Sequence, residues 1–200
     1  MNEIPSVEFL RGQSIGLLGG SFNPAHDGHL HISQFAVNLL NLDSVWWLVS
    51  PQNPLKSSFG MAPFSERLEA ARKIASSTSI VVTGMEADFL GEYTIDTLQI
   101  IQKRFKQVRF VWLMGADNLI QIDQWKDWEK IFSTIPIAVF DRLPYSEKVE
   151  ESAAVKKFNN KRVSSLKANR ISYMEAPAWV YLRIPINSSS STKIRRNGNS

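Results

Sequence analysis

Short apolar runs recur along the chain, each with the length of a β-strand. They cover residues 14–18, 45–49, 80–83, 108–114 and 135–140, and Val, Ile and aromatic residues are prominent in them. Continuous apolar runs are typical of strands that are buried on both faces of a sheet. We therefore expect five strands.

Amphipathic stretches separate these runs. The first follows Pro24, where Leu30, Phe35 and Leu39, with apolar neighbours beside them, approximate one face of a helix. Similar helical spacing predicts further helices over residues 65–75, 94–105 and 122–132. Between residues 52 and 61, Pro, Asn, Ser and Gly predict a loop.

This alternation of strand and helix predicts an α/β fold. Connections of this kind favour a parallel sheet with helices on both faces, a Rossmann-like, doubly wound arrangement. We expect a single domain over residues 1–200, with its core at about 14–196. In such a sheet, ligands bind at the carboxyl ends of the strands, and most of the motifs below fall there.

The amino-acid composition excludes several kinds of catalytic and metal site. Hydrophobic residues make up 44% and charged residues 21% of the chain, which is ordinary for a globular protein. The absence of cysteine excludes disulfides, thiolate nucleophiles and Cys-based metal sites. The N-terminus does not resemble a signal peptide and the apolar runs are too short to span a bilayer, so a cytoplasmic location is expected. The net charge of +4 suits a phosphate-rich ligand, either a nucleotide or a nucleic acid.

The segment 19–29 joins the first strand to the first helix and has the features of an anion cradle. Glycines at its start, Gly19 and Gly20, permit positive φ and close approach of the backbone, and the helix N-terminus directs amide groups at an anion. His26 and His29 are spaced so that both imidazoles can face one site and hydrogen-bond phosphate oxygens. A plain turn is the simpler reading of the glycine pair. A metal site is disfavoured because the chain has only three histidines and no thiolate, and the segment fits neither the Walker nor the dinucleotide-binding glycine pattern.

This segment resembles the signature of the nucleotidyltransferases with the His/Thr-x-Gly-His motif. The form Gly-Gly-Ser-Phe-Asn-Pro-x-His-x-Gly-His-Leu, matched from residue 19 to residue 30, is similar to that of the bacterial nicotinate-nucleotide adenylyltransferases. The resemblance implies that His26 and His29 contact phosphate near the α-phosphate of ATP. It also implies that the turn takes part in ATP binding, through Gly19, Gly20, Ser21 and Phe22.

A second signature of the same superfamily lies near the C-terminus. Residues 190–195 read Ser-Ser-Thr-Lys-Ile-Arg, and the resemblance assigns Ser191, Thr192 and Arg195 to the outer phosphates. Lys56 is a weaker phosphate candidate. Its loop departs from the family pattern, because Leu55 stands where a histidine is usual.

Two further elements resemble the family's nicotinate-mononucleotide pocket. Residues 92–98 match its Ser-Tyr-Thr-x-Asp-Thr-Leu element except at Glu92, and residues 114–119 with Trp125 match its Gly-x-Asp-x-Leu…Trp element. Core packing is the alternative reading of Trp125, and it is the one we expect for Trp46, Trp47 and Trp112. The candidate mononucleotide-binding residues are Asn53, Tyr93, Thr94, Asp117, Trp125 and Arg142.

The resemblance implies that ATP and nicotinate mononucleotide react to give nicotinate adenine dinucleotide and pyrophosphate, a step of NAD biosynthesis. The mononucleotide phosphate is already a nucleophile, so the reaction requires positioning and fixed positive charge rather than a catalytic base. Mg²⁺ is expected to accompany ATP, with no metal site formed by the protein itself. Three alternatives remain open: a different acceptor such as nicotinamide mononucleotide or phosphopantetheine, a cytidylyltransferase, or a non-catalytic module that binds nucleotides or nucleic acid. The partners expected are the two small-molecule substrates, with no nucleic acid and no membrane, and the sequence leaves the oligomeric state open.

Overall fold

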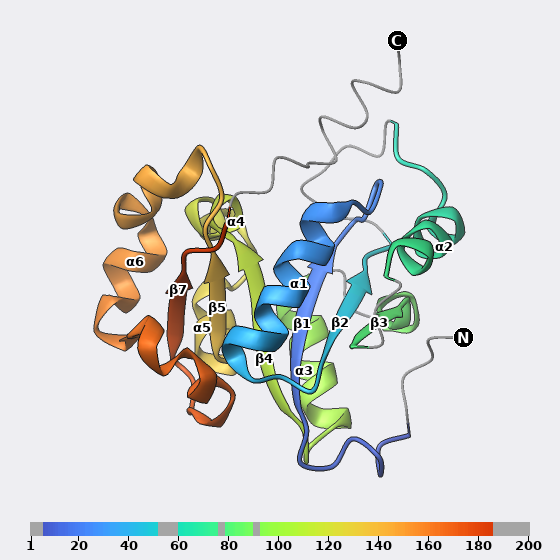
Figure 1. Cartoon of the computed structure of the whole chain (residues 1–200), viewed down its shortest axis with the longest axis horizontal. Helices are drawn as coiled ribbons and strands as arrows, with labels where there is room; N and C mark the ends of the chain where they lie inside the picture. Colours follow the sequence, from blue (N-terminus) through green and yellow to red (C-terminus); the bar gives the residue numbers. More distant parts are fainter. Residues whose placement is uncertain (1–5, 52–59, 76–78, 90–92, 186–200) are drawn as a thin grey trace.

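A computed structural model describes residues 6–51, 60–75, 79–89 and 93–185 of the chain. Within these residues, seven parallel strands form one sheet in the order β3-β2-β1-β4-β5-β7-β6 (Figure 1). The strands are β1 (Ser14–Gly20), β2 (Ser44–Val49), β3 (Ile80–Thr83), β4 (Arg109–Gly115), β5 (Ile137–Phe140), β6 (Arg162–Val163) and β7 (Trp179–Leu182). The α-helices are α1 (Asp27–Leu40), α2 (Phe64–Ile74), α3 (Thr94–Arg104), α4 (Ala116–Ile120), α5 (Trp128–Thr134) and α6 (Ala153–Phe158). Shorter 3₁₀ helices are η1 (Met85–Asp88), η2 (Ile122–Gln124), η3 (Tyr145–Glu151), η4 (Asn159–Lys161) and η5 (Ser165–Tyr173).

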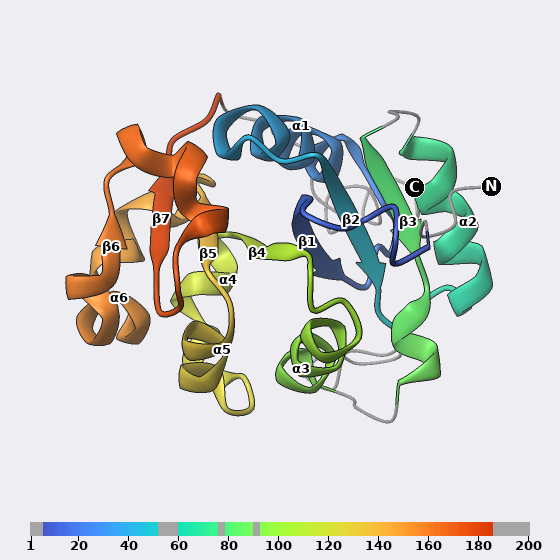
Figure 2. The same ribbon diagram turned by 90° about the horizontal axis from the view of Figure 1, so that it is seen from below.

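The two faces of the sheet are covered by different helices. Alternate residues of each strand point to opposite faces, so that Trp46 belongs to one core and Trp47 to the other. On one face α3, α4, α5 and α6 cover the sheet, and on the other face α1, α2 and η5 do (Figure 2). Burial on both faces explains why the strands are apolar throughout.

The strand order places a topological switch beside β1. The chain passes from β1 outward to β2 and β3, then returns to pair β4 with the other side of β1. In open α/β sheets a crevice forms at the carboxyl ends of the strands where the order reverses, and ligands bind there. The turn after β1, which carries the histidine motif, lies at this point.

Most of the predicted elements are confirmed, including the five strands, the parallel sheet with helices on both faces, and the burial of Trp46, Trp47 and Trp112. The helix predicted over 122–132 is wrong. That stretch forms η2 and then α5, and Asp127 at the start of α5 has a left-handed φ of 51° that interrupts helical backbone. The pair β6 and β7 extends the sheet beyond the five predicted strands.

The predicted inward face of α1 is also partly wrong. Its buried residues are Ser33, Ala36 and Leu40, whereas Leu39 is 38% exposed. Ser33 is tolerated in the core because its hydroxyl accepts a hydrogen bond from Trp47 Nε1 at 2.7 Å and donates to the carbonyl of His29.

Candidate active site

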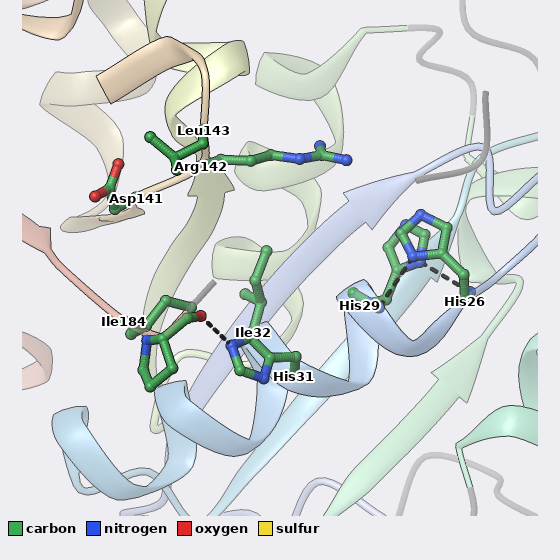
Figure 3. Close-up of a pocket in the computed structure, with 10 residues that line it drawn as sticks. His26, His29, His31, Ile32, Asp141, Arg142, Leu143 and Ile184 are labelled. Atoms are coloured by element: carbon green, nitrogen blue, oxygen red, sulfur yellow. Dashed lines mark hydrogen bonds between the residues drawn. The ribbon is translucent and has the colours of Figure 1, made fainter. Parts of the chain in front are cut away.

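A pocket lies at the carboxyl edge of the sheet, between the first turns of α1 and the segments that follow β5 and β7. Figure 3 shows Arg142 extending from the end of β5 toward the histidine pair, with His31 and Ile184 at the opposite end. The lining residues are His26, Gly28, His29, His31, Ile32, Asp141, Arg142, Leu143, Ile184 and Pro185. The pocket therefore has a cationic and imidazole-rich end and a more apolar end.

The turn between β1 and α1 has a different backbone from the one expected. The residue with positive φ is Phe22, at 46°, whereas neither Gly19 nor Gly20 has positive φ. The Phe22 ring is buried between Trp47, at a centroid distance of 5.1 Å, and His29, at 4.6 Å, and this packing holds an uncommon conformation in place. Gly19 is needed for another reason, because a Cβ there would lie 2.4 Å from the Trp112 indole.

His26 and His29 cap the helix that they begin. His26 Nδ1 accepts the backbone N–H of Gly28 at 3.0 Å, and His29 Nδ1 accepts the backbone N–H of His26 at 3.2 Å. Their rings lie 3.9 Å apart between centroids. The amide of Gly28 therefore points at an imidazole rather than at an anion site, which corrects the simple picture of a helix N-terminus with free amides.

This capping pattern fixes which ring nitrogen of His26 carries a proton. An Nδ1 that accepts a hydrogen bond is unprotonated, so the neutral ring carries its proton on Nε2. Burial, reinforced by the positive charge of Arg142 and opposed by Asp27, lowers the pKa of His26 from 6.5 to about 4. At neutral pH His26 is thus an uncharged ring with one N–H donor, suited to a phosphate oxygen.

Arg142 is positioned by a carboxylate at the start of α4, directly after the neighbouring strand β4. Its Nη1 lies 3.0 Å from Asp117 Oδ2, and both side chains are partly buried. The other carboxylate oxygen of Asp117, Oδ1, is buried and has no hydrogen-bond partner among the described residues. The ion pair leaves further guanidinium N–H groups of Arg142 for an anion, since the group has five donors.

A second network fixes the turn that carries Arg142. Asp141 Oδ1 accepts hydrogen bonds from Tyr181 Oη, at 2.6 Å, and from Ser146 Oγ. Burial alone would raise the pKa of Asp141, but these bonds and the backbone of Arg142 hold the pKa below its usual value. Asp141 is therefore an ionised anchor for the segment at the end of β5.

The residues predicted for a pyridine ring gather at the start of α3. Tyr93 is the N-cap of α3 and Thr94 its first residue. The Lys126 ammonium lies 4.3 Å from the Tyr93 ring centroid and 3.7 Å from Asp96, so the residue next to Trp125 contacts the first turn of α3. Trp125 itself is half-buried and packs against the core, and its role at the pyridine ring stays a prediction.

Other predicted residues lie elsewhere in the described structure or outside it. Gly20 is the last residue of β1 and Ser21 follows it, and Asp117, which pairs with Arg142, lies at the start of α4. The remaining predicted phosphate or mononucleotide residues, Asn53, Lys56, Ser191, Thr192 and Arg195, lie outside the described residues.

Sequence reasoning missed part of the pocket. His31 was not proposed, although it lies close to the motif, and its Nε2 donates to the carbonyl oxygen of Pro185 at 2.7 Å. Asp141 could have been suspected from its place beside Arg142, whereas Ile184 carries no sequence signal. Outside this pocket, on η1, burial raises the pKa of Glu86 to about 7, opposed by a hydrogen bond from Thr97 on α3.

Within the described ranges, no group of three or more His, Asp or Glu side chains is arranged to hold a metal ion. No helix in the same ranges is long and apolar enough to cross a membrane.

Comparison with known proteins places the chain in a class. The family model described as cytidylyltransferase-like matches residues 17–197, almost the whole sequence. Together with the doubly wound sheet and the histidine motif at its switch point, this match shows that the chain belongs to the cytidylyltransferase-like nucleotidyltransferases.

Similar curated proteins narrow the class. A protein of Parvibaculum lavamentivorans named "Probable nicotinate-nucleotide adenylyltransferase" is 48% identical over 187 residues, which cover 94% of this chain and 93% of that protein. A protein of the same name from a Caulobacter species is 44% identical over 181 residues, covering 90% of this chain and 96% of that one. The chain belongs to the nicotinate-nucleotide adenylyltransferase family.

Solved structures agree on the fold. The nicotinic acid mononucleotide adenylyltransferase of Plasmodium falciparum, in complex with NaAD, superposes with a TM-score of 0.69 over 92% of this chain and 83% of that one, at 20% identity. The arrangement of the sheet and its helices is therefore shared with that enzyme, although few residues are.

Proposed function

We propose that this protein transfers the adenylyl group of ATP to nicotinate mononucleotide and releases pyrophosphate. The observation that carries the proposal is the group of His26, His29 and Arg142, which places N–H donors and a positive charge at the switch point of a nucleotidyltransferase fold. The family membership supports the same reaction.

The chemistry requires positioning more than proton transfer. A phosphate oxygen of the mononucleotide attacks the α-phosphorus of ATP, and the bond from that phosphorus to the oxygen bridging the β-phosphate breaks, so that pyrophosphate leaves with the electron pair. The attacking phosphate is ionised at neutral pH, hence no side-chain base is needed. Neutral His26 donates through Nε2–H, and Arg142 opposes the charge that develops on the phosphate oxygens.

The apolar end of the pocket suits the adenine base. Ile32 on α1 and Leu143 and Ile184, which follow β5 and β7, offer apolar contacts, and an aromatic base fills such a space favourably. The phosphates then extend toward the histidine pair at the other end.

The mononucleotide is assigned to the start of α3. Tyr93, Thr94 and Trp125 supply an aromatic surface and first-turn donors, which match a pyridinium ring that bears a carboxylate. Asp117 aligns Arg142, and Arg142 is assigned to the phosphate of the mononucleotide. Asn53 is proposed to assist at the same substrate.

The outer phosphates of ATP are assigned to Ser191, Thr192 and Arg195, with Lys56 as a further contact. Mg²⁺ is proposed to enter as part of the ATP complex, with phosphate oxygens and water as its main ligands. A cytoplasmic location is proposed because both substrates are intracellular metabolites.

Pyrophosphate release from ATP, measured with a panel of acceptors, tests the proposal. We expect turnover with nicotinate mononucleotide that exceeds turnover with nicotinamide mononucleotide or phosphopantetheine, and little turnover when CTP replaces ATP. Release without any acceptor, or equal release with phosphopantetheine, would contradict it.

A further inference from the structure

Arg67, on α2, is a buried arginine that the reaction as described does not use. It is only 2% exposed, and its side chain is directed at main-chain carbonyls. Nε donates to Ala62 at 2.9 Å, Nη2 donates to Pro51 at 2.7 Å, and Nη1 donates to Ser50 at 2.8 Å and to Ser21. One guanidinium thus contacts four carbonyl oxygens.

These four carbonyls belong to three separate segments. Ser21 lies in the turn between β1 and α1, Ser50 and Pro51 follow β2, and Ala62 precedes α2. The stretch between Pro51 and Ala62 contains the phosphate candidate Lys56. Arg67 therefore ties both ends of that stretch to the turn that leads into the histidine motif.

Other hydrogen bonds join the same segments. The backbone N–H of Ser50 donates to Gly20 at 2.9 Å. The side chain of Asn23 accepts from the backbone of Ala62 at 3.1 Å and donates to the carbonyl of Gly60 at 3.2 Å. Arg67 lies among these bonds and makes the largest number of contacts.

The choice of arginine at a buried position requires a reason, because burial of a charge is costly. Among the described residues no carboxylate lies within salt-bridge distance of Arg67. Arginine stays protonated even when buried, and its planar fork can hold several acceptors in fixed directions, which lysine cannot do. The planar shape of the Arg67 guanidinium directs its N–H groups at the four carbonyl oxygens, and its positive charge strengthens these hydrogen bonds.

We infer that Arg67 is a positioning residue of the phosphate site, which fixes the turn after β1 at Ser21, residues 50–51 directly after β2, and Ala62 relative to His26 and His29. This inference rests on the proposed function. Without the Arg67 guanidinium the turn after β1 can shift. A displacement of about 1 Å at a reacting group can lower the rate about 100-fold. Among the described residues, Arg67 makes no hydrogen bond with α3 or with Trp125, so binding of the pyridine ring is affected least.

Steady-state kinetics of Arg67→Lys and Arg67→Met test the inference, with Arg72→Met, an exposed position on the same helix, as the matched control. We expect kcat/KM for ATP to fall about 100-fold in Arg67→Met and about 10-fold in Arg67→Lys, with a raised KM for ATP and a KM for nicotinate mononucleotide changed less than threefold. Arg72→Met should match the unmodified protein. If Arg67→Met does not fold, Arg67→Lys alone carries the test, because it keeps charge and most of the volume.

Two results would overturn the inference. One is an Arg67→Lys protein with unchanged KM and kcat for ATP, which would show that the fork is not needed. The other is a protein that loses only thermal stability and regains full activity on cooling, which would indicate a purely structural role. Failure of the proposed function is distinguished from both, since in that case the unmodified protein itself does not use nicotinate mononucleotide.

Discussion

Replacement of His26 by asparagine separates two roles of its ring. Asparagine is among the preferred N-cap residues, so its side-chain oxygen can accept the Gly28 N–H that His26 Nδ1 accepts. It cannot titrate, and it does not place a donor where Nε2 lies. Removal of the cap altogether, in His26→Ala, is expected to cost about 1 kcal/mol of stability, which makes asparagine the better probe.

The structure gives the size of the pH effect. The pKa of His26 is lowered from 6.5 to about 4, first by burial and then by Arg142. The unfolded chain therefore binds a proton at a pH where the folded protein does not, and stability present above pH 6.5 is lost as the pH falls toward 4. The full lowering of the His26 pKa corresponds to about 3 kcal/mol in the free energy of unfolding, of which about 2 kcal/mol is lost by pH 5.

Urea unfolding at pH 7.5, 6 and 5 measures this effect. Between pH 7.5 and pH 5 the free energy of unfolding should fall by about 2 kcal/mol more in the unmodified protein than in His26→Asn. Contributions from the other titrating groups largely cancel in that difference. Two proteins whose stabilities fall in parallel would refute the assignment of a buried neutral ring to His26.

Four further substitutions test other parts of the site. His29→Ala should lower kcat about 100-fold with an unchanged circular dichroism spectrum; unchanged turnover would remove its role. Asp117→Asn should raise KM for nicotinate mononucleotide about 10-fold, through misplacement of Arg142, while the stability changes by less than about 1 kcal/mol because the pair is partly exposed. Trp125→Ala should raise the same KM about 10-fold and leave KM for ATP unchanged, and equal effects on both substrates would instead favour core packing. Tyr181→Phe should cost about 1 kcal/mol in thermal unfolding, since Asp141 loses a hydrogen bond; no measurable cost would count against the anchoring network.

Strands β1 to β5 could be predicted because burial on both faces of a sheet requires a continuous run of apolar residues. Strands β1 to β5 are covered on both faces, and so they are apolar without alternation. The histidine motif could be placed because it follows β1 immediately, and the carboxyl ends of parallel strands share one edge.

The errors have local physical causes. Trp125, Trp128 and Ile131 have helical spacing, but Asp127 adopts left-handed backbone, and spacing alone cannot report a backbone angle. The short strand β6 pairs with β7, which in turn pairs with β5, and the Arg162 guanidinium lies 4.9 Å from the Trp179 ring centroid. Residues 179–182 do form a short apolar run that could have indicated β7, whereas the two-residue β6 has no such pattern.

The site's electrostatics could not be predicted either. Histidine is not among the common N-cap residues, so the sequence suggested free amides where the structure has imidazole acceptors. The Asp117–Arg142 pair and the Asp141–Tyr181 hydrogen bond join residues that are far apart in the chain. Such partners follow from the sheet order, which brings the ends of β4, β5 and β7 together.

Transfer of label from ATP tests the central claim most directly. Purified protein would be incubated with nicotinate mononucleotide and ATP labelled at either the α- or the γ-phosphate, and the products separated by chromatography. The account predicts that the α-label appears in nicotinate adenine dinucleotide and the γ-label in pyrophosphate, and that His26→Asn slows both about 100-fold while its fold persists. Appearance of the γ-label in the pyridine product, or equal rates in the variant and the unmodified protein, would contradict it.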